Sequence, residues 1–379
     1  MKIAQKHWTE QTGWKAVSPN GVSDRTQLAL VFGSVDILKN PARLEEIHRL
    51  FPNARVVGCS TAGEIVANRV FDNSLTATGV FFEKTALQFA QTTVESMDGS
   101  FDAGRKLAEA LDHEGLVHVF VLSDGLNVNG SALAKGLRSA LPDTVAVTGG
   151  LAGDQDRFQE TLVFLDAIAD GKTVAAIGFY GDQVQIGYGS RGGWDSFGPD
   201  RLVTRSKANV VYELDGQPIL QLYQRYLGEF ASGLPATGLL FPLSLAVNDG
   251  QERLVRTILA INEQDGSMTF AGDVPEGSFA RLMKANVERL VDGAADSARQ
   301  SRIAGAPAPC LAMLISCVGR KLVLKQRVDE EVESVQDTLG ANTALTGFYS
   351  YGEICPMGPD RKQAELHNQT MTITTFAER

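Results

Sequence analysis

The sequence predicts a mixed α/β (α+β) fold, built from internally repeated strand–helix–strand units that form two or more packed sheets. Three segments, residues 28–65, 117–154 and 310–354, follow one plan. Each has an apolar run, an amphipathic helix, a second apolar run and a glycine-rich turn with an acid. The apolar runs are short and continuous, as in strands that helices bury on both faces. We call these segments, together with the predicted strands and helices that flank each of them, the first, second and third units.

The helix of each unit is predicted from its apolar face and its end signals. In the first unit Asn40 is a typical N-cap, and Pro41 suits the first helical position. In the third unit Gly340 favours a helix end. Apolar residues recur at helical spacing: Leu44, Ile47 and Phe51; Leu133, Leu137 and Leu141; Val332, Val335 and Leu339. We also expect helices over 101–111 and 279–298, and paired strands after each turn.

The turns that close the units carry the clearest repeat. Residues 58–65 and 347–354 share the pattern G-x-x-[ST]-x-G-E-I, and residues 149–154 form a shorter copy that ends in aspartate. This agreement indicates internal duplication. Two roles stay open for the acids Glu64, Asp154 and Glu353. Each carboxylate binds a ligand at the strand ends, or it accepts hydrogen bonds from amides of its own turn.

Composition limits the classes of function. Of 379 residues, 44% are hydrophobic and 21% are charged, and a formal net charge of −10 argues against nucleic-acid binding. The N-terminus has no apolar segment of signal-peptide length, and no apolar run approaches the roughly 18 residues of a membrane span. Four cysteines without a CxxC pair indicate neither a disulfide framework nor a zinc site. We expect a cytoplasmic protein without membrane insertion.

The chain is expected to divide into an N-terminal extension, residues 1–26, and two domains, residues 27–210 and 211–379. Residues 182–275 lack the plan of the units. Within them, the glycine-rich segment 187–193 predicts a flexible turn, and residues 217–227 predict a helix. Because the linkers are short, the two domains should pack closely.

Two arginines beside apolar strands are candidates to clamp a carboxylate with two hydrogen bonds. They are Arg256 and Arg320, and the alternative for each is an internal ion pair with Glu353 or Glu276. Glu353 is the best ligand candidate among the acids, because tyrosines and polar residues crowd its predicted sheet. We expect a pocket bounded by Glu353, Arg256 and Arg320. The predicted ligand-binding residues are Glu353, Arg256, Arg320, Tyr349, Asn368, Glu64 and Asp154.

No catalytic residue is assigned. The turns at Cys59–Glu64 and Tyr349–Glu353 are places where nucleophiles often sit. However, no G-x-S-x-G elbow, Walker motif or HExxH motif accompanies them. An enzyme, such as a hydrolase or transferase acting from one of these turns, is the alternative to a binding protein. A purely structural adaptor is a third hypothesis for the function.

Several motifs resemble one family. GCSTAGEI is similar to the N-terminal FIST domain, while YQRYLG, FAGDVPEG, TGFYSYGEI and LHNQTMTIT resemble the C-terminal FIST domain. The resemblance assigns residues 27–210 to a FIST N-like domain and residues 211–379 to a FIST C-like domain. It implies a sensor of a small ligand, such as an amino acid, in a signal-transduction pathway. Such a sensor acts on a separate partner such as a histidine kinase, and a homo-oligomer is compatible with it.

The resemblance also implies a haem-containing form. Some stand-alone proteins of this type are described as haem-based nitric-oxide sensors of two-component systems. Haem needs an axial ligand, usually histidine or cysteine. His367 is the first candidate, with a structural role as its alternative, and Cys355-Pro356 resembles the Cys-Pro signature of haem-responsive proteins.

Overall fold

Two parallel strands joined by a helix form the centre of each unit. The computed structural model describes residues 1–379 except 19–22, 169–170, 248–251, 304, 306–307 and 358–362. β3 pairs with β4 in the first unit, β9 with β10 in the second and β24 with β25 in the third, all in parallel. The predicted repeat is therefore confirmed. The bounds are β3 Leu28–Gly33, β4 Arg55–Ser60, β9 Leu116–Ser123, β10 Ala146–Leu151, β24 Leu311–Cys317 and β25 Ala344–Ser350.

The connecting helices begin and end where their sequence signals lie. The Asn40 side chain accepts a hydrogen bond from the Ala42 amide, and Gly340 follows the last helix with a positive φ. Among the described residues, every helix is too short or too polar to span a bilayer. The helices are α2 (Pro41–Leu50), α4 (Gly130–Ala140) and α8 (Val328–Leu339), with α1 (Val35–Leu38) before α2 and α7 (Val318–Leu324) before α8.

After its second parallel strand, each unit gives a hairpin to another unit's sheet. The hairpin β5–β6 of the first unit pairs with β25 of the third. β11–β12 of the second pairs with β4 of the first, and β26–β27 of the third pairs with β10 of the second. The exchange therefore passes through all three units and returns to its start. The bounds are β5 Glu64–Val66, β6 Arg69–Phe71, β11 Val163–Leu165, β12 Ala167–Ile168, β26 Gly352–Met357 and β27 Gln363–His367.

Antiparallel strands complete each sheet on its other side. β7, β13 and β28 pair with β3, β9 and β24, and β1, β8 and β14 lie outside them. The three sheets thus share one strand order, and the segment predicted as an N-terminal extension supplies β1 and β2 to the first sheet. The bounds are β1 Lys2–Thr9, β2 Gly13–Ala16, β7 Leu75–Phe81, β8 Ala86–Thr93, β13 Thr173–Tyr180, β14 Val184–Arg191 and β28 Met371–Glu378.

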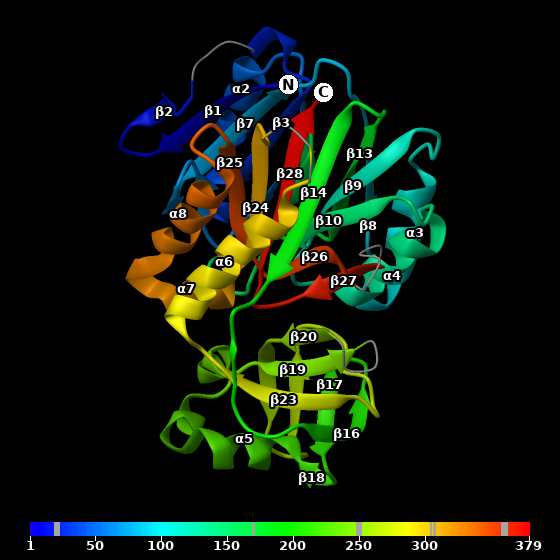
Figure 1. Ribbon diagram of the computed structural model, residues 1–379, viewed down its shortest axis with the longest axis vertical. Helices are drawn as coiled ribbons and strands as arrows, with labels where there is room; N and C mark the ends of the chain where they lie inside the picture. The colour runs from blue at the N-terminus through cyan, green and yellow to red at the C-terminus, as the bar shows by residue number, and fades with distance from the viewer. Residues whose placement is uncertain (19–22, 169–170, 248–251, 304, 306–307, 358–362) are drawn as a thin grey trace.

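The three sheets share a common apolar core, and the helices cover their outer sides (Figure 1). Phe32, Phe120 and Phe348, one from each unit, belong to this core and are buried. α2 packs against the first sheet, and α4 with α3 (Ser100–Glu109) against the second. α8 and α6 (Val287–Ser301) cover the third.

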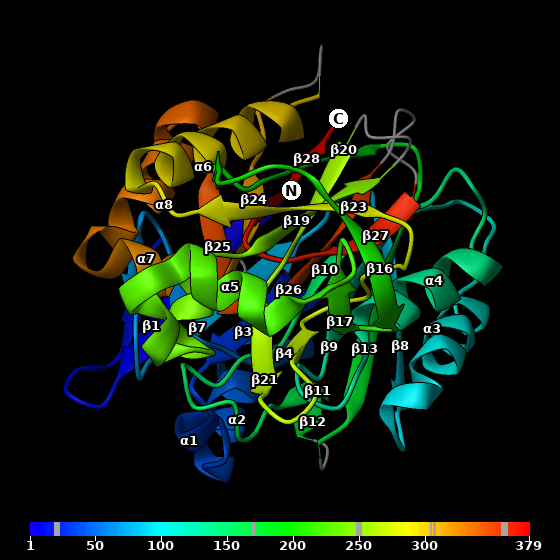
Figure 2. The ribbon, with the colours of Figure 1, turned by 90° about the horizontal axis from the view of Figure 1, so that it is seen from below.

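A smaller lobe is inserted between β14 and α6 of the third unit. It forms a separate body with its own core at one end of the molecule (Figures 1 and 2). The predicted boundary after residue 210 falls within β17 of this lobe, directly after its first residue, and the division into residues 27–210 and 211–379 stays a prediction. The lobe contains α5 (Ile219–Leu227), β15 Asp195–Ser196, β16 Arg201–Lys207, β17 Val210–Leu214, β18 Gln217–Pro218, β19 Leu243–Val247, β20 Glu252–Arg256, β21 Ile258–Asn262, β22 Ser267–Phe270 and β23 Phe279–Lys284.

Two local predictions are wrong. Residues 187–193, expected as a flexible turn, lie mostly in the paired strand β14. Its glycines allow α6 to lie close, because a Cβ at Gly189 would collide with the Ser297 carbonyl oxygen. The helix expected over 279–298 begins only at Val287, since residues 279–284 pair with the lobe's other strands as β23.

Candidate functional site

The three glycine-rich turns meet at one end of the common core. A Cβ at Gly153 would lie only 2.8 Å from the Ala62 amide nitrogen, so the glycine permits this close approach. The acids Glu64, Asp154 and Glu353 therefore stand on turns that touch one another. Backbone hydrogen bonds link each turn to the next: Ala62 N to Tyr349 O (2.8 Å), Gly153 N to Ser60 O (3.0 Å) and Tyr351 N to Leu151 O (3.1 Å).

Glu64 ties its turn to the start of the last strand of the first unit. The Thr61 hydroxyl donates to Oε1 at 2.6 Å, and the Ser74 hydroxyl and amide donate to Oε2 at 2.7 and 3.2 Å. Ser74 directly precedes β7. Burial disfavours the charged form and raises the pKa of Glu64 to about 7.

Glu353 makes the same set of contacts in the third unit. The Ser350 hydroxyl donates to Oε1 at 2.8 Å, and the Thr370 hydroxyl and amide donate to Oε2 at 2.8 and 3.1 Å. Thr370 directly precedes β28, as Ser74 precedes β7. Burial raises the pKa of Glu353 to about 8, although these hydrogen bonds favour the carboxylate.

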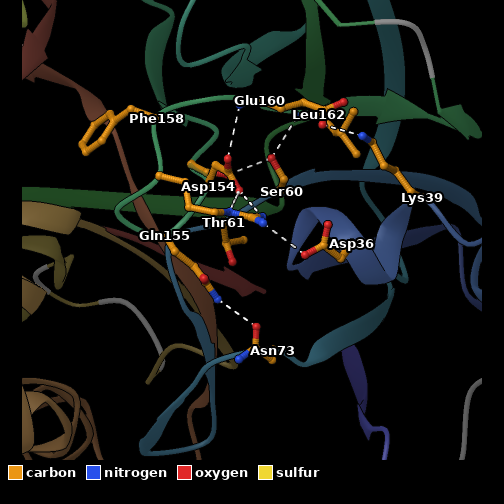
Figure 3. Close-up of polar contacts among 12 residues, drawn as sticks. Asp36, Lys39, Ser60, Thr61, Asn73, Asp154, Gln155, Phe158, Glu160 and Leu162 are labelled. Atoms are coloured by element: carbon orange, nitrogen blue, oxygen red, sulfur yellow. Dashed lines mark hydrogen bonds and ion pairs between the residues drawn. The ribbon is translucent and has the colours of Figure 1, made fainter.

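Asp154 differs from the two glutamates (Figure 3). Its Oδ1 accepts hydrogen bonds from Arg157, with Nε at 2.9 Å, and its Oδ2 accepts from the Glu160 amide at 3.2 Å. In the second unit the hydrogen bond to the start of the following strand, β13, is made by Asp124 instead. Its Oδ2 accepts from the Lys172 amide at 3.1 Å. All three acids thus have protein partners, as expected of turn-stabilising groups, and their ligand role stays a prediction.

Arg320 is enclosed in a buried ion pair that the sequence reading missed. Its Nη2 lies 2.6 Å from Oε2 of Glu331, and both side chains are 0% exposed. The ion-pair partners considered from the sequence, Glu353 and Glu276, are therefore not the ones observed. The Tyr349 hydroxyl also donates to Glu331 rather than to Glu353, and burial with this carboxylate raises the pKa of Tyr349.

Asn368 and His367 lie in the protein interior. Both polar atoms of the Asn368 amide are buried without a hydrogen-bond partner among the described residues. His367 Nε2 lies 3.1 Å from the Cys355 carbonyl oxygen, so that nitrogen carries the proton and donates to it. Burial lowers the pKa of His367 to about 4. This hydrogen bond leaves the lone pair of Nδ1 available for a metal, so it is the burial of the ring, 8% exposed, that disfavours an axial haem ligand, and haem binding stays a prediction.

Cys59 does not have the surroundings of a nucleophile. Its side chain is 0% exposed and packs in the common apolar core, and burial raises the pKa of its thiol. The neighbouring Ser60 hydroxyl donates to the Gly153 carbonyl oxygen at 2.8 Å and accepts from the Leu162 amide at 2.9 Å (Figure 3). These side chains hold neighbouring turns together.

A pocket of about 190 Å³ lies between the small lobe and the main body. Strands β19 and β20 of the lobe line one side, and α4, β26 and β27 of the body line the other. In Figure 1 these elements lie on the two sides of the junction between lobe and body. Among the described residues, the lining includes the predicted ligand residue Arg256 but neither Glu353 nor Arg320. The sequence reading thus found one of the residues at this pocket.

Arg256 is fixed in the pocket wall by carbonyl groups. Its Nε donates to Asp273 O at 3.0 Å, and its Nη1 donates to Leu366 O at 2.8 Å. The side chain is 3% exposed, and burial lowers its pKa to about 10, so the guanidinium stays charged near neutral pH. No carboxylate of the described residues lies within 4.0 Å of it, although Glu365 and Asp273 are near enough to oppose this lowering of its pKa.

Four polar lining residues were missed from the sequence: Ser131, Lys135, Asp273 and Glu365. Ser131 and Lys135 belong to α4, whereas Asp273 belongs to a turn of the small lobe. The motif FAGDVPEG contains Asp273 and was the one signal available for it. The approach of α4 to the lobe depends on tertiary structure.

Two models of known domain families match the sequence of this chain. The FIST N domain matches residues 27–217 and the FIST C domain matches residues 220–356. The chain belongs to the FIST family. FIST domains are sensory domains with a general role in signal transduction. The FIST N match includes the first two units, and the FIST C match includes most of the small lobe and much of the third unit.

Individual proteins similar to this FIST chain add little about its activity. The uncharacterized protein MJ1623 of Methanocaldococcus jannaschii is 26% identical over 206 residues, which are 50% of this chain and 38% of that protein. The chain thus spans well under half the length of this curated relative. A cyanuric acid hydrolase structure from A. caulinodans matches 100% of this chain and 99% of its own at 9% identity, with a TM-score of 0.35. A TM-score this low supports no inference.

Proposed function

We propose that this FIST protein senses a small organic ligand in the pocket between its small lobe and its main body. The observation that carries the proposal is Arg256, a buried guanidinium in the pocket wall whose hydrogen bonds among the described residues go to carbonyl oxygens and not to a carboxylate. Pockets between two bodies of one chain are common ligand sites. A carboxylate-containing metabolite, such as an amino acid, suits this arginine.

The signal would pass to a separate protein by contact. The pocket has walls from both bodies, so a ligand that touches both changes how firmly the lobe is held. A histidine kinase or a related signalling protein in the cytoplasm would respond to that change, and a homo-oligomer of the sensor is compatible with it. The family's general role in signal transduction supports this part of the proposal.

Haem is left out of the proposal because the first candidate for its ligand, His367, is buried. The Nε2 of His367 donates to the Cys355 carbonyl oxygen, which leaves Nδ1 as the one ring nitrogen that could bind iron. An enzyme acting from the turn at residues 59–64 is disfavoured by the burial of Cys59 and by the hydrogen bonds of Ser60.

A thermal-shift screen of the whole chain against a metabolite library tests the proposal. A ligand at one hundred times its dissociation constant adds roughly 2.7 kcal/mol to the free energy of unfolding, which gives a clear rise in Tm. The rise should be lost in Arg256→Lys, which keeps the charge but lacks the guanidinium fork. It should survive Arg253→Lys, because Arg253 lies on the same strand and bonds Asp200 instead. A library without any stabilising compound would favour a structural adaptor.

A further inference from the structure

We propose that the pocket contains an oxyanion subsite, in which Ser131, the first turn of α4 and Arg256 bind the carboxylate of a small organic ligand. The inference rests on the proposed function. It adds the charge of the ligand, the groups that hold that charge and the way in which the ligand joins the two bodies.

The Ser131 hydroxyl is the first observation. Its side chain lines the pocket, the residue is 1% exposed, and Oγ has no hydrogen-bond partner among the described residues. A buried hydroxyl without a partner is costly, and such groups are rare in folded proteins. A ligand oxygen that accepts from Ser131 would remove that cost.

The first turn of α4 borders the same pocket through Ser131. Ser131 is the second residue of this 11-residue helix. Asn129 accepts from the Ala132 amide at 3.0 Å, and the first intrahelical bond runs from the Leu133 amide to Asn129 O. The amides of Gly130 and Ser131 precede both bonds. Amides at this position, together with the helix dipole, favour an anion.

The pocket lining contains two cations and two carboxylates, Lys135, Arg256, Asp273 and Glu365, so its own charges balance. Lys135 Nζ pairs with Asp273 Oδ2 at 3.1 Å, and Arg138 Nη1 lies 3.9 Å from Glu365 Oε1. Arg256 has only carbonyl acceptors among the described residues. The other buried arginine described above has its own carboxylate. Glu365 and Asp273 favour the charged form of Arg256 without contacting it, so a ligand carboxylate would give this guanidinium a direct partner, whereas a dianion would meet repulsion from the two acids.

The remaining lining sets the shape of the ligand and its structural effect. Leu245, Val247 and Leu254 give the pocket an apolar side, which suits a short carbon chain. Ser131 belongs to the main body and Arg256 to the small lobe. A carboxylate bound to both would connect the two bodies through one group, which restrains their relative movement.

Titration calorimetry on the whole chain tests the subsite with straight-chain monocarboxylates of about two to six carbons and their primary amides. At fixed ionic strength, a carboxylate should bind at least about tenfold more tightly than its matched amide. Ser131→Ala should reduce that ratio about tenfold, and Arg256→Lys should reduce it further. Ser139→Ala changes an exposed serine of the same helix and should leave the ratio unchanged.

The outcomes that refute the subsite can be told apart from those that also refute the proposed function. Equal affinities for carboxylate and amide, or a ratio that survives Ser131→Ala, refute the subsite and leave the sensor proposal intact. The same holds if other metabolites stabilise the chain and every monocarboxylate fails to bind. If neither these probes nor the library binds, the proposed function fails as well. Ser131→Ala removes a hydroxyl that no described group uses, so the variant should fold.

Discussion

Replacing Glu353 by glutamine should remove a large pH dependence of stability. Burial raises the pKa of this carboxyl from an ordinary value of 4.5 to about 8. The folded state therefore holds a proton that the unfolded state releases above pH 4.5. By linkage, the free energy of unfolding falls as pH rises from about 4.5 to about 8, and is constant above that range with respect to this group.

The size of the effect follows from the difference between the two pKa values. Each unit of pKa corresponds to about 1.4 kcal/mol, so this carboxyl accounts for a loss of up to roughly 5 kcal/mol between pH 4.5 and pH 8. Glutamine has nearly the same shape and does not titrate. Relative to wild type, Glu353→Gln should gain stability by as much as that amount as pH rises through this range.

Urea denaturation followed by circular dichroism at pH 5, 7 and 9 measures the difference. Glu333→Gln is the matched control, because Glu333 is exposed on α8 and its replacement should leave the pH profile of wild type unchanged. A stability difference between Glu353→Gln and wild type that stays constant from pH 5 to pH 9 would refute the reasoning. A difference that changes in the opposite direction would show that Arg320 stabilises the carboxylate more than burial destabilises it.

Three further outcomes are expected. Glu331→Gln removes the carboxylate partner of buried Arg320 and should lower the free energy of unfolding, measured in urea, by about 3–5 kcal/mol. Glu333→Gln should be nearly neutral. A loss below about 1 kcal/mol in Glu331→Gln would contradict the buried ion pair. Gly189→Ala should lower the free energy of unfolding by about 1–3 kcal/mol, because the new Cβ would collide with the backbone of α6. Gly99→Ala should have little effect, because its Cβ would make only an ordinary van der Waals contact. Equal losses in the two variants would show that close packing is not the cause. Because His367 is buried, haem added to the purified chain should give no Soret band that depends on it; a band lost in His367→Ala would show that its Nδ1 binds the iron.

The repeated units could be predicted because their signals are local. Asn40, Pro41 and Gly340 mark helix ends within a few residues, and the apolar stripes need only one turn of helix to be recognised. The exchange of hairpins could not be predicted in the same way. β5 pairs with β25, about 280 residues further along the chain, and no short pattern in either strand specifies that partner.

The residues of the candidate site likewise divide into those with a local sequence signal and those placed only by tertiary structure. Arg256 was found because a charge beside an apolar strand is visible in the sequence, whereas Ser131 reaches the same pocket only through the packing of the small lobe on α4. Glu331 had a local signal that was overlooked. It shares the i, i+4, i+8 spacing of Val335 and Leu339, and so lies on the buried face of its helix.

The exchanged hairpins also constrain how such a chain could have arisen and how it can fold. A polypeptide with a single unit would leave one sheet without its hairpin and one hairpin without a sheet. Three copies of it would satisfy one another as a closed, three-fold symmetric trimer with swapped elements. In the present chain the same closure is intramolecular. Its sheets therefore form only after distant segments meet, so the body should fold slowly and lose its structure as one cooperative unit.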